Sequence, residues 1–118
     1  MAIFNLMNVK TGLLIRTISG DSFSRAVETE ARAGRSLANA DLTGLGQNGD
    51  PTELNLSGGT FTNAKMDGVN LTGSLLHGAD ISGASLKNAI LRNVKARGIT
   101  TTNSTQTGID KRGSDGDL

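Results

Sequence analysis

Residue types that commonly carry catalysis or bind metals are scarce in this sequence. His77 is the single histidine, and there is no cysteine. Catalytic triads and zinc sites need several converging side chains, and no Ser, Cys or carboxylate stands at a recognisable catalytic spacing from His77. We therefore predict that the protein is not an enzyme, that it has no catalytic residue and no metal site, and that His77 lies on the surface beside Arg97.

A glycine motif at Gly44, Gly46 and Gly49 matches the G-x-G-x-x-G pattern of dinucleotide-binding turns. That chemistry requires a buried strand before the motif and a helix after it, and the sequence predicts neither. Gly44 and Gly49 fall instead on the corner positions of a five-residue repeat. We therefore expect no cofactor.

Basic residues are the more informative polar feature. Residues 54–113 carry seven Lys and Arg against three Asp, a net charge of +4. Arg92 is expected to stack near Arg112, and such a like-charge pair is destabilising unless an anionic group lies across it. A merely solvated surface is the favoured interpretation, because side chains this long can splay apart, and a binding cluster is the alternative. The candidate partner-binding residues combine this cluster with two outward apolar residues: Leu75, Ile90, Arg92, Lys95, Arg97, Lys111 and Arg112.

The elements that position these residues begin with a predicted N-terminal cap over residues 1–34. Residues 3–18 predict a β-hairpin with its turn at 8–12, because strand-type residues flank a segment that ends in Gly12. Residues 22–33 predict an amphipathic helix that ends before Gly34. With 118 residues the chain has room for one domain, and no stretch is long and apolar enough for a membrane span or a secretion signal.

From residue 35 the sequence has a period of five. Residues 54–98 divide into nine pentapeptides whose first position is small or aliphatic and whose fifth position is Gly or Asn. Their third positions are apolar: Leu56, Phe61, Met66, Leu71, Leu76, Ile81, Leu86, Leu91 and Ala96. Neither a helix nor a straight strand keeps every fifth residue on one face, so the chain must turn a corner once per repeat. Gly and Asn tolerate the left-handed backbone that such corners use.

The segments ANADL, GADIS, GASLK and NAILR resemble the A-(D/N)-L-x-x motif of pentapeptide-repeat proteins. The resemblance covers most of residues 35–113 and implies a mainly β fold, a right-handed quadrilateral β-helix in which four repeats make one coil. The hairpin and the run AVETEARAGRSLANADL are similar to the segment that precedes the repeats in small members encoded by bacteriophages.

Four coils are predicted, over residues 35–53, 54–73, 74–93 and 94–113, followed by a tail at 114–118. In this register the segment 50–53 is a shortened fourth side, and the interior columns run through successive coils. The columns are Leu37, Leu56, Leu76 and Ala96; Leu42, Phe61, Ile81 and Thr101; Gln47, Met66, Leu86 and Gln106; and Leu71, Leu91 and Lys111. The polar residues of the last coil are typical of a terminal repeat.

The resemblance implies a non-enzymatic structural or interaction protein. We expect a bacteriophage virion component, such as a capsid decoration or tail-associated protein, that binds capsid or tail proteins and can form homo-oligomers. The alternative is a regulator of a host enzyme such as DNA gyrase, but that role calls for a long acidic rod. The net charge of the whole chain, +1, gives no strong attraction to nucleic acid. We expect no membrane partner, and a location in the virion or in the cytoplasm of the host bacterium.

Overall fold

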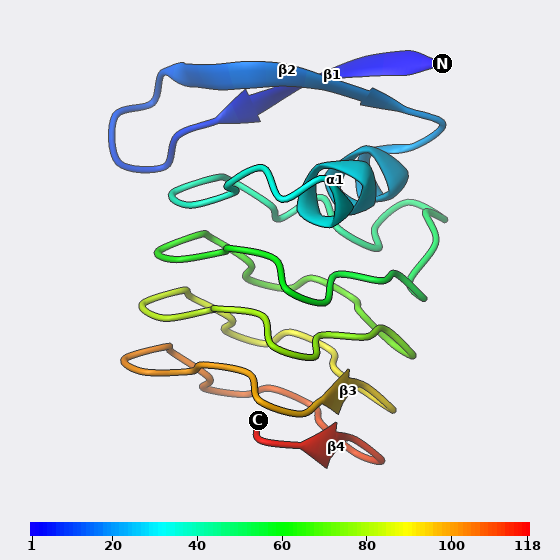
Figure 1. Ribbon diagram of the computed structural model, residues 1–118, viewed down its shortest axis with the longest axis vertical. Coiled ribbons are helices and arrows are strands. Elements are labelled where there is room, and N and C mark those ends of the chain that lie inside the picture. The colour runs from blue at the N-terminus through cyan, green and yellow to red at the C-terminus, as the bar shows by residue number, and fades with distance from the viewer.

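The computed structural model describes residues 1–118 and begins with the predicted hairpin (Figure 1). β1 (Ala2–Met7) pairs antiparallel with β2 (Leu14–Gly20), and Phe4 lies opposite Ile18. Leu6 and Ile18 are buried on the inner face of this sheet. Gly12 in the connection has a φ of +72°, the left-handed conformation that glycine adopts without steric penalty. The hairpin therefore forms as the sequence predicts.

The predicted helix is α1 (Phe23–Arg32). Ser22 is its N-cap, and the Ser22 Oγ accepts a hydrogen bond from the backbone N–H of Arg25 at 3.1 Å, which satisfies one of the free donors of the first turn. The helix buries Ala26, Val27 and Ala31. The hairpin and α1 lie at one end of the molecule, and the rest of the chain winds away from them in stacked coils (Figure 1).

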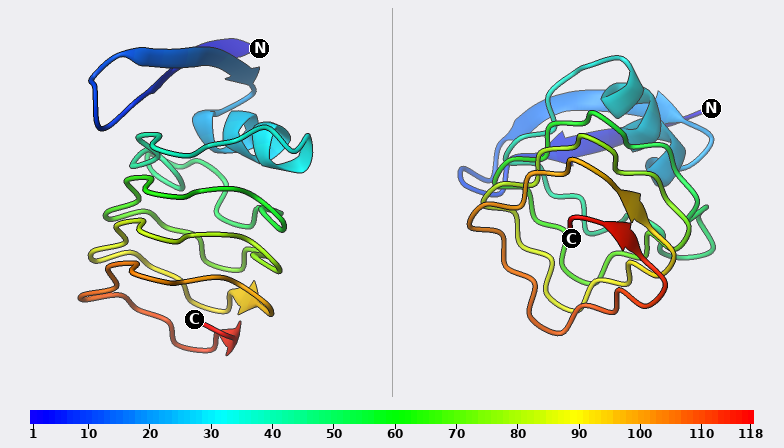
Figure 2. Two further views of the ribbon diagram at one scale, coloured as in Figure 1. Left: turned by 60° about the vertical axis from the view of Figure 1, so that its left-hand side comes forward. Right: turned by 60° about the horizontal axis from the view of Figure 1, so that its bottom comes forward.

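The repeats form a β-helix-like solenoid. From Asn55 onward, parallel bridges join residues that are 20 positions apart, for example Asn55 with Leu75 and Leu75 with Lys95. The corner residues take left-handed backbone, with φ of +58° at Asn63 and +67° at Gly83. Four repeats therefore complete one turn of the chain before the next turn stacks on it, and the stacked coils nearly overlap when the far end comes forward (Figure 2).

Side chains fill the interior of the solenoid. Leu71 and Leu86 are 0% and 1% exposed, so the column register predicted from residue 54 onward is confirmed. The small residues at the first repeat positions, such as Ala79, Ala84 and Ala89, are also buried. The interior columns become more polar at the far end, where Thr101 and Gln106 are half-buried and Lys111 is exposed.

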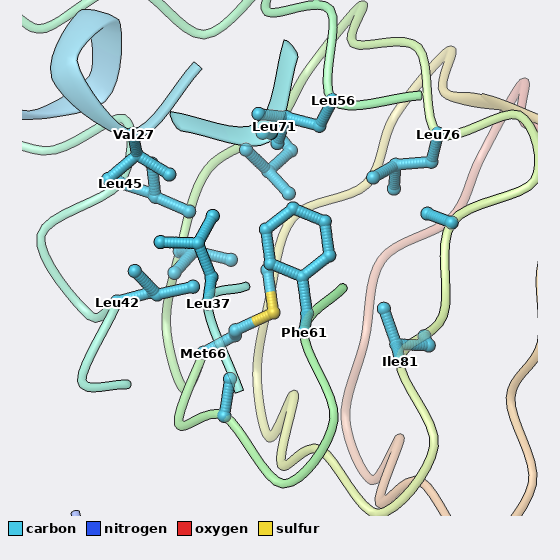
Figure 3. Packing of buried hydrophobic residues seen from close by; sticks show 14 of the residues in the cluster. Val27, Leu37, Leu42, Leu45, Leu56, Phe61, Met66, Leu71, Leu76 and Ile81 are labelled. Atoms are coloured by element: carbon cyan, nitrogen blue, oxygen red, sulfur yellow. The ribbon is translucent and has the colours of Figure 1, made fainter. Parts of the chain in front are cut away.

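The register predicted for residues 35–53 is wrong. The backbone N–H of Leu37 donates to the Thr60 carbonyl, and Asp41 bridges Lys65. Leu37 therefore stacks near Phe61 and not Leu56. Correspondingly, Leu42 stacks near Met66 and not Phe61, and the predicted position of Gln47 over Met66 is lost. Figure 3 shows Leu37, Leu42 and Met66 gathered beside Phe61.

The physical reason is that α1 takes the place of one side of the first coil. The backbone N–H of Asn55 donates to the Glu28 Oε2 at 2.6 Å, whereas the equivalent N–H of Leu75 one coil later donates to the carbonyl of Leu54. Asp41 and Lys65 are 24 residues apart instead of 20, so the first coil contains four additional residues before Leu54. The segment 50–53 thus belongs to a longer connection and is not a shortened side.

The chain ends by starting another layer. β3 (Lys95–Ala96) pairs in parallel with β4 (Asp115–Gly116). The Oδ2 of Asp117 accepts a hydrogen bond from the backbone N–H of Gly98 at 2.7 Å. Residues 114–118 therefore lie across one side of the last coil and leave its other sides uncovered (Figure 2).

Candidate interaction surfaces

The predicted like-charge pair is neutralised within the chain. The Oδ2 of Asp110 accepts from the Nε of Arg92 at 2.6 Å and from the Nη2 of Arg112 at 2.8 Å. The hydrogen bonds from Arg112 and then from Arg92 hold the pKa of the Asp110 carboxyl well below its usual range. The anionic group that this like-charge pair requires is therefore supplied by the chain itself, because Asp110 lies between the two arginines.

The other predicted basic residues lie near the tail. The Arg97 Nη2 is 3.8 Å from the Asp115 Oδ2, with both side chains mostly exposed, and the Lys111 Nζ donates to the Leu118 carbonyl at 3.3 Å. Lys95 is exposed and forms no ion pair. Lys95, Arg97 and Lys111 thus gather near the end of the solenoid, but exposed pairs of this kind contribute little energy.

The two predicted apolar contact residues are half-buried and lie apart. Leu75 bridges Asn55 and Lys95 in one stack of strands, whereas Ile90 bridges Asn70 and Asp110 in another. The structure does not bring Leu75 and Ile90 together into one patch.

His77 belongs to a ladder of side-chain to backbone hydrogen bonds. Its Nδ1 accepts from the backbone N–H of Arg97 at 3.0 Å, and its own backbone N–H donates to the Ser57 Oγ at 3.2 Å. His77 therefore lies beside Arg97, as predicted, although it is half-buried instead of fully exposed. No three His, Asp or Glu side chains lie close enough together to hold a metal ion.

The glycines of the G-x-G-x-x-G motif serve packing. Gly46 has a φ of +69°, and a Cβ at this position would collide with the carbonyl oxygen of Asn70. A Cβ at Gly44 would lie 3.0 Å from the ring of Phe23. These two glycines therefore allow the first coil to approach both the next coil and α1.

An open β edge lies at the far end of the solenoid. In the preceding coil, backbone N–H groups such as those of Ile81 and Gly83 donate to the coil that follows. On the last coil the equivalent donors have no partner within the chain, and neither do three carbonyls, those of Ile99, Ser104 and Ile109. The six unpaired N–H groups are those of Thr101, Asn103, Gln106, Gly108, Lys111 and Gly113. This edge can hydrogen-bond an added strand.

The hairpin carries a second exposed surface that the sequence analysis did not identify. The large apolar side chains with the greatest exposure all belong to the hairpin: Met1, Ile3, Val9, Leu13 and Leu14. The signal was present in the adjacent apolar pairs Ile3–Phe4 and Leu14–Ile15, because consecutive strand residues point to opposite faces. A strand that is apolar on both faces is typical of one covered on both sides, whereas only the inner face of this hairpin is covered.

These observations define a class of protein: a solenoid of parallel-bridged coils with an interior filled by its own side chains. The family model for pentapeptide repeats matches residues 55–93 with eight copies. Residues 55–93 of the chain are therefore pentapeptide repeats.

Solved structures of the same kind are similar at low identity. HetL, a pentapeptide repeat protein involved in heterocyst differentiation regulation from the cyanobacterium Nostoc sp. strain PCC 7120, is 26% identical over 51% of this chain, with a TM-score of 0.38. The match spans 33% of HetL. The pentapeptide repeat protein Rfr23 from the cyanobacterium Cyanothece 51142 is 19% identical over 60% of this chain and 68% of Rfr23, with a TM-score of 0.32. No curated protein matches this sequence.

α1 is not long and apolar enough to cross a lipid bilayer.

Proposed function

We propose that this protein is a non-enzymatic interaction module that binds other proteins through the C-terminal end of a right-handed quadrilateral β-helix. The observation that carries the proposal is the open edge of the last coil, with its six unpaired N–H groups and three unpaired carbonyls. The opposite end is covered by the hairpin and α1, which act as its cap. A partner strand can therefore extend the solenoid at one end only.

Exposed charges support the same placement. Lys95, Arg97 and Lys111 lie beside the open edge, and charges at the rim of a contact set the rate and orientation of association more than its affinity. Arg92 and Arg112 contribute less, because Asp110 already binds both guanidinium groups.

The specific role we propose is a virion component of a bacteriophage, either a capsid decoration or a tail-associated protein. The support is the similarity of the N-terminal segment to that of small phage-encoded family members. A regulator of a host enzyme such as DNA gyrase is the second candidate. It is less favoured because the rod is short, with extents of 33 × 27 × 24 Å, and its repeats carry a net positive charge.

The test is co-sedimentation with purified phage particles or with the isolated capsid and tail proteins. Truncation after Gly98 would expose an equivalent edge on the preceding coil but would remove Lys111, so the shortened shaft should bind more weakly. Lys111→Glu should weaken binding without unfolding the chain, since the side chain is exposed. The matched control is Lys65→Glu, the same charge change on an earlier coil. Full occupancy by the Lys111 variant would show that the contact lies elsewhere.

A further inference from the structure

Asn48 and Gly49 form an exposed turn at the end of the glycine motif. Their φ angles are +55° and +81°, and the backbone N–H of Asp50 donates to the Gln47 carbonyl at 2.9 Å. Two consecutive residues of positive φ inside such a hydrogen bond are characteristic of a type I′ turn, for which Asn-Gly is a preferred sequence. Both residues are exposed, and no other asparagine of the chain is followed by glycine.

The side-chain amide of Asn48 and the backbone nitrogen of Gly49 are placed to react with each other. The nitrogen of the residue after an asparagine can attack the carbonyl carbon of the asparagine side chain, because the two atoms close a five-membered ring. The attack requires an N–H that is free to lose its proton and a neighbour that does not crowd it. Gly49 meets both conditions, since its N–H donates no hydrogen bond within the chain and glycine has no Cβ.

The asparagines at the corners of the repeats lack this freedom. They also have left-handed backbone, with φ from +58° to +62°, but the N–H after each one donates to the carbonyl three residues earlier. The N–H of Ala64, for example, donates to the Phe61 carbonyl at 3.1 Å, and that of Ser104 to the Thr101 carbonyl at 2.9 Å. This hydrogen bond must break before the nitrogen can attack. The corner asparagines concerned are Asn39, Asn63, Asn88, Asn93 and Asn103.

We infer that Asn48 is a site of spontaneous backbone modification, at which the asparagine converts to aspartate and isoaspartate without an enzyme. The Gly49 nitrogen loses its proton and forms a bond to the Cγ of Asn48, while the Cγ–Nδ2 bond breaks and Nδ2 leaves with a proton as ammonia. Water then opens the succinimide ring at either carbonyl. Attack at Cγ gives aspartate, whereas attack at the backbone carbonyl gives isoaspartate, in which the main chain runs through the former side chain.

The turn joins two residues that hold the first turn of α1. Buried Ser24 donates from its backbone N–H and its Oγ to the Asp50 Oδ2, at 3.2 Å and 3.1 Å, and its Oγ accepts from the Gly46 N–H at 2.9 Å. Isoaspartate inserts one additional carbon into the main chain between Gly46 and Asp50, so the two residues no longer hold Ser24 in the same geometry. Aspartate adds a charge but no main-chain atom and should keep these contacts. We therefore expect the isoaspartate form to have a less stable cap.

The experiment incubates the purified, folded full chain at pH 7.5 and pH 8.5 and maps its peptides by mass spectrometry at successive times. Conversion raises the mass of a peptide by the difference between water and ammonia. We expect conversion at Asn48 to be about tenfold faster than at Asn103, where a corner hydrogen bond and a Cβ oppose the attack, and faster at the higher pH. Asn48→Gly, which is compatible with positive φ, should remove the signal. Unfolding in urea should speed conversion at Asn103.

The effect on the cap is measured on the isoaspartate form after chromatographic separation. It should unfold at a temperature roughly 5 °C below that of Asn48→Asp, with faster hydrogen exchange at the Ser24 amide. Equal conversion at Asn48 and Asn103 in the folded chain, or none at Asn48, would overturn the inferred site. Identical melting of the isoaspartate form and Asn48→Asp would overturn the inferred effect on the cap. These variants leave Lys111 unchanged, so the proposal for the C-terminal edge is tested separately.

Discussion

Replacement of Leu76 by Ala tests whether the columns of the solenoid are packed as the structure shows. Leu76 is 1% exposed and lies between Leu56 above and Ala96 below. Its backbone is held from both sides, because Leu56 N–H donates to the Leu75 carbonyl and Leu76 N–H donates to the Lys95 carbonyl at 2.7 Å. Neighbouring coils therefore cannot collapse freely into the space that the smaller side chain leaves.

We expect a loss of about 3 kcal/mol in the free energy of unfolding, within the range of about 2 to 5 kcal/mol for buried Leu→Ala changes. The assay is urea denaturation followed by circular dichroism, with the slope of the free energy against urea unchanged. Leu14→Ala, the same substitution at a half-exposed position, is the control and should change stability by less than about 0.5 kcal/mol. A loss below about 1 kcal/mol at Leu76 would mean that the column is not packed.

Three further predictions concern the cap and the corners. Burial raises the pKa of Glu30, but hydrogen bonds and charge from Arg16 and Arg35 outweigh it and lower the pKa below 4.5. The stabilisation by Glu30 should thus be present above that pH and lost as pH falls through the lowered pKa, so Glu30→Gln should reduce stability by about 1 to 2 kcal/mol at pH 7. Urea unfolding at pH 7 and in acid measures this, and an equal loss at both would refute it. Gly83→Ala should destabilise more than Gly78→Ala in parallel thermal melts, because both glycines have positive φ but only at Gly83 would the Cβ meet the Asn63 Oδ1; equal effects would mean that the contact is unimportant. Deletion of residues 1–34 removes Glu28 from the Asn55 N–H and should produce oligomers or aggregate by light scattering, whereas a stable monomer would show that the cap does not protect this edge.

Much of the fold was predictable because the residue types within each five-residue repeat determine where the chain turns and which side chains point inward. A third-position residue such as Leu71 must point inward if Gly or Asn turns a corner every five residues, and its burial follows from that geometry. The hairpin and α1 were predictable for a similar reason, since Gly12, Ser22 and Gly34 mark their turns and ends.

The register of the first coil could not be predicted by counting residues along the five-residue period. The phase change at residues 50–53 fits either a side that is one residue short or a connection that is four residues long, and the five-residue period does not separate them. The deciding contact is tertiary: Glu28 of α1 supplies an acceptor to Asn55 where a preceding strand would otherwise lie.

The candidate site was predictable only in part. The sequence indicated that Arg92 and Arg112 lie together, but the position of Asp110 between them depends on side-chain geometry. The exposure of the hairpin's outer face was missed because both faces read as apolar, and the sequence alone does not tell which face the solenoid covers.

Amide hydrogen exchange in the free chain and in the presence of a purified capsid or tail protein tests the central claim most directly. The account predicts fast exchange in the free chain at Thr101, Gln106 and Lys111, slow exchange at Ile81, Leu86 and Leu91 in the coil before, and protection of the first set on binding. Amides of the last coil that are already protected in the free chain, or that stay unprotected in a saturated complex, would contradict the claim that this edge is the binding surface.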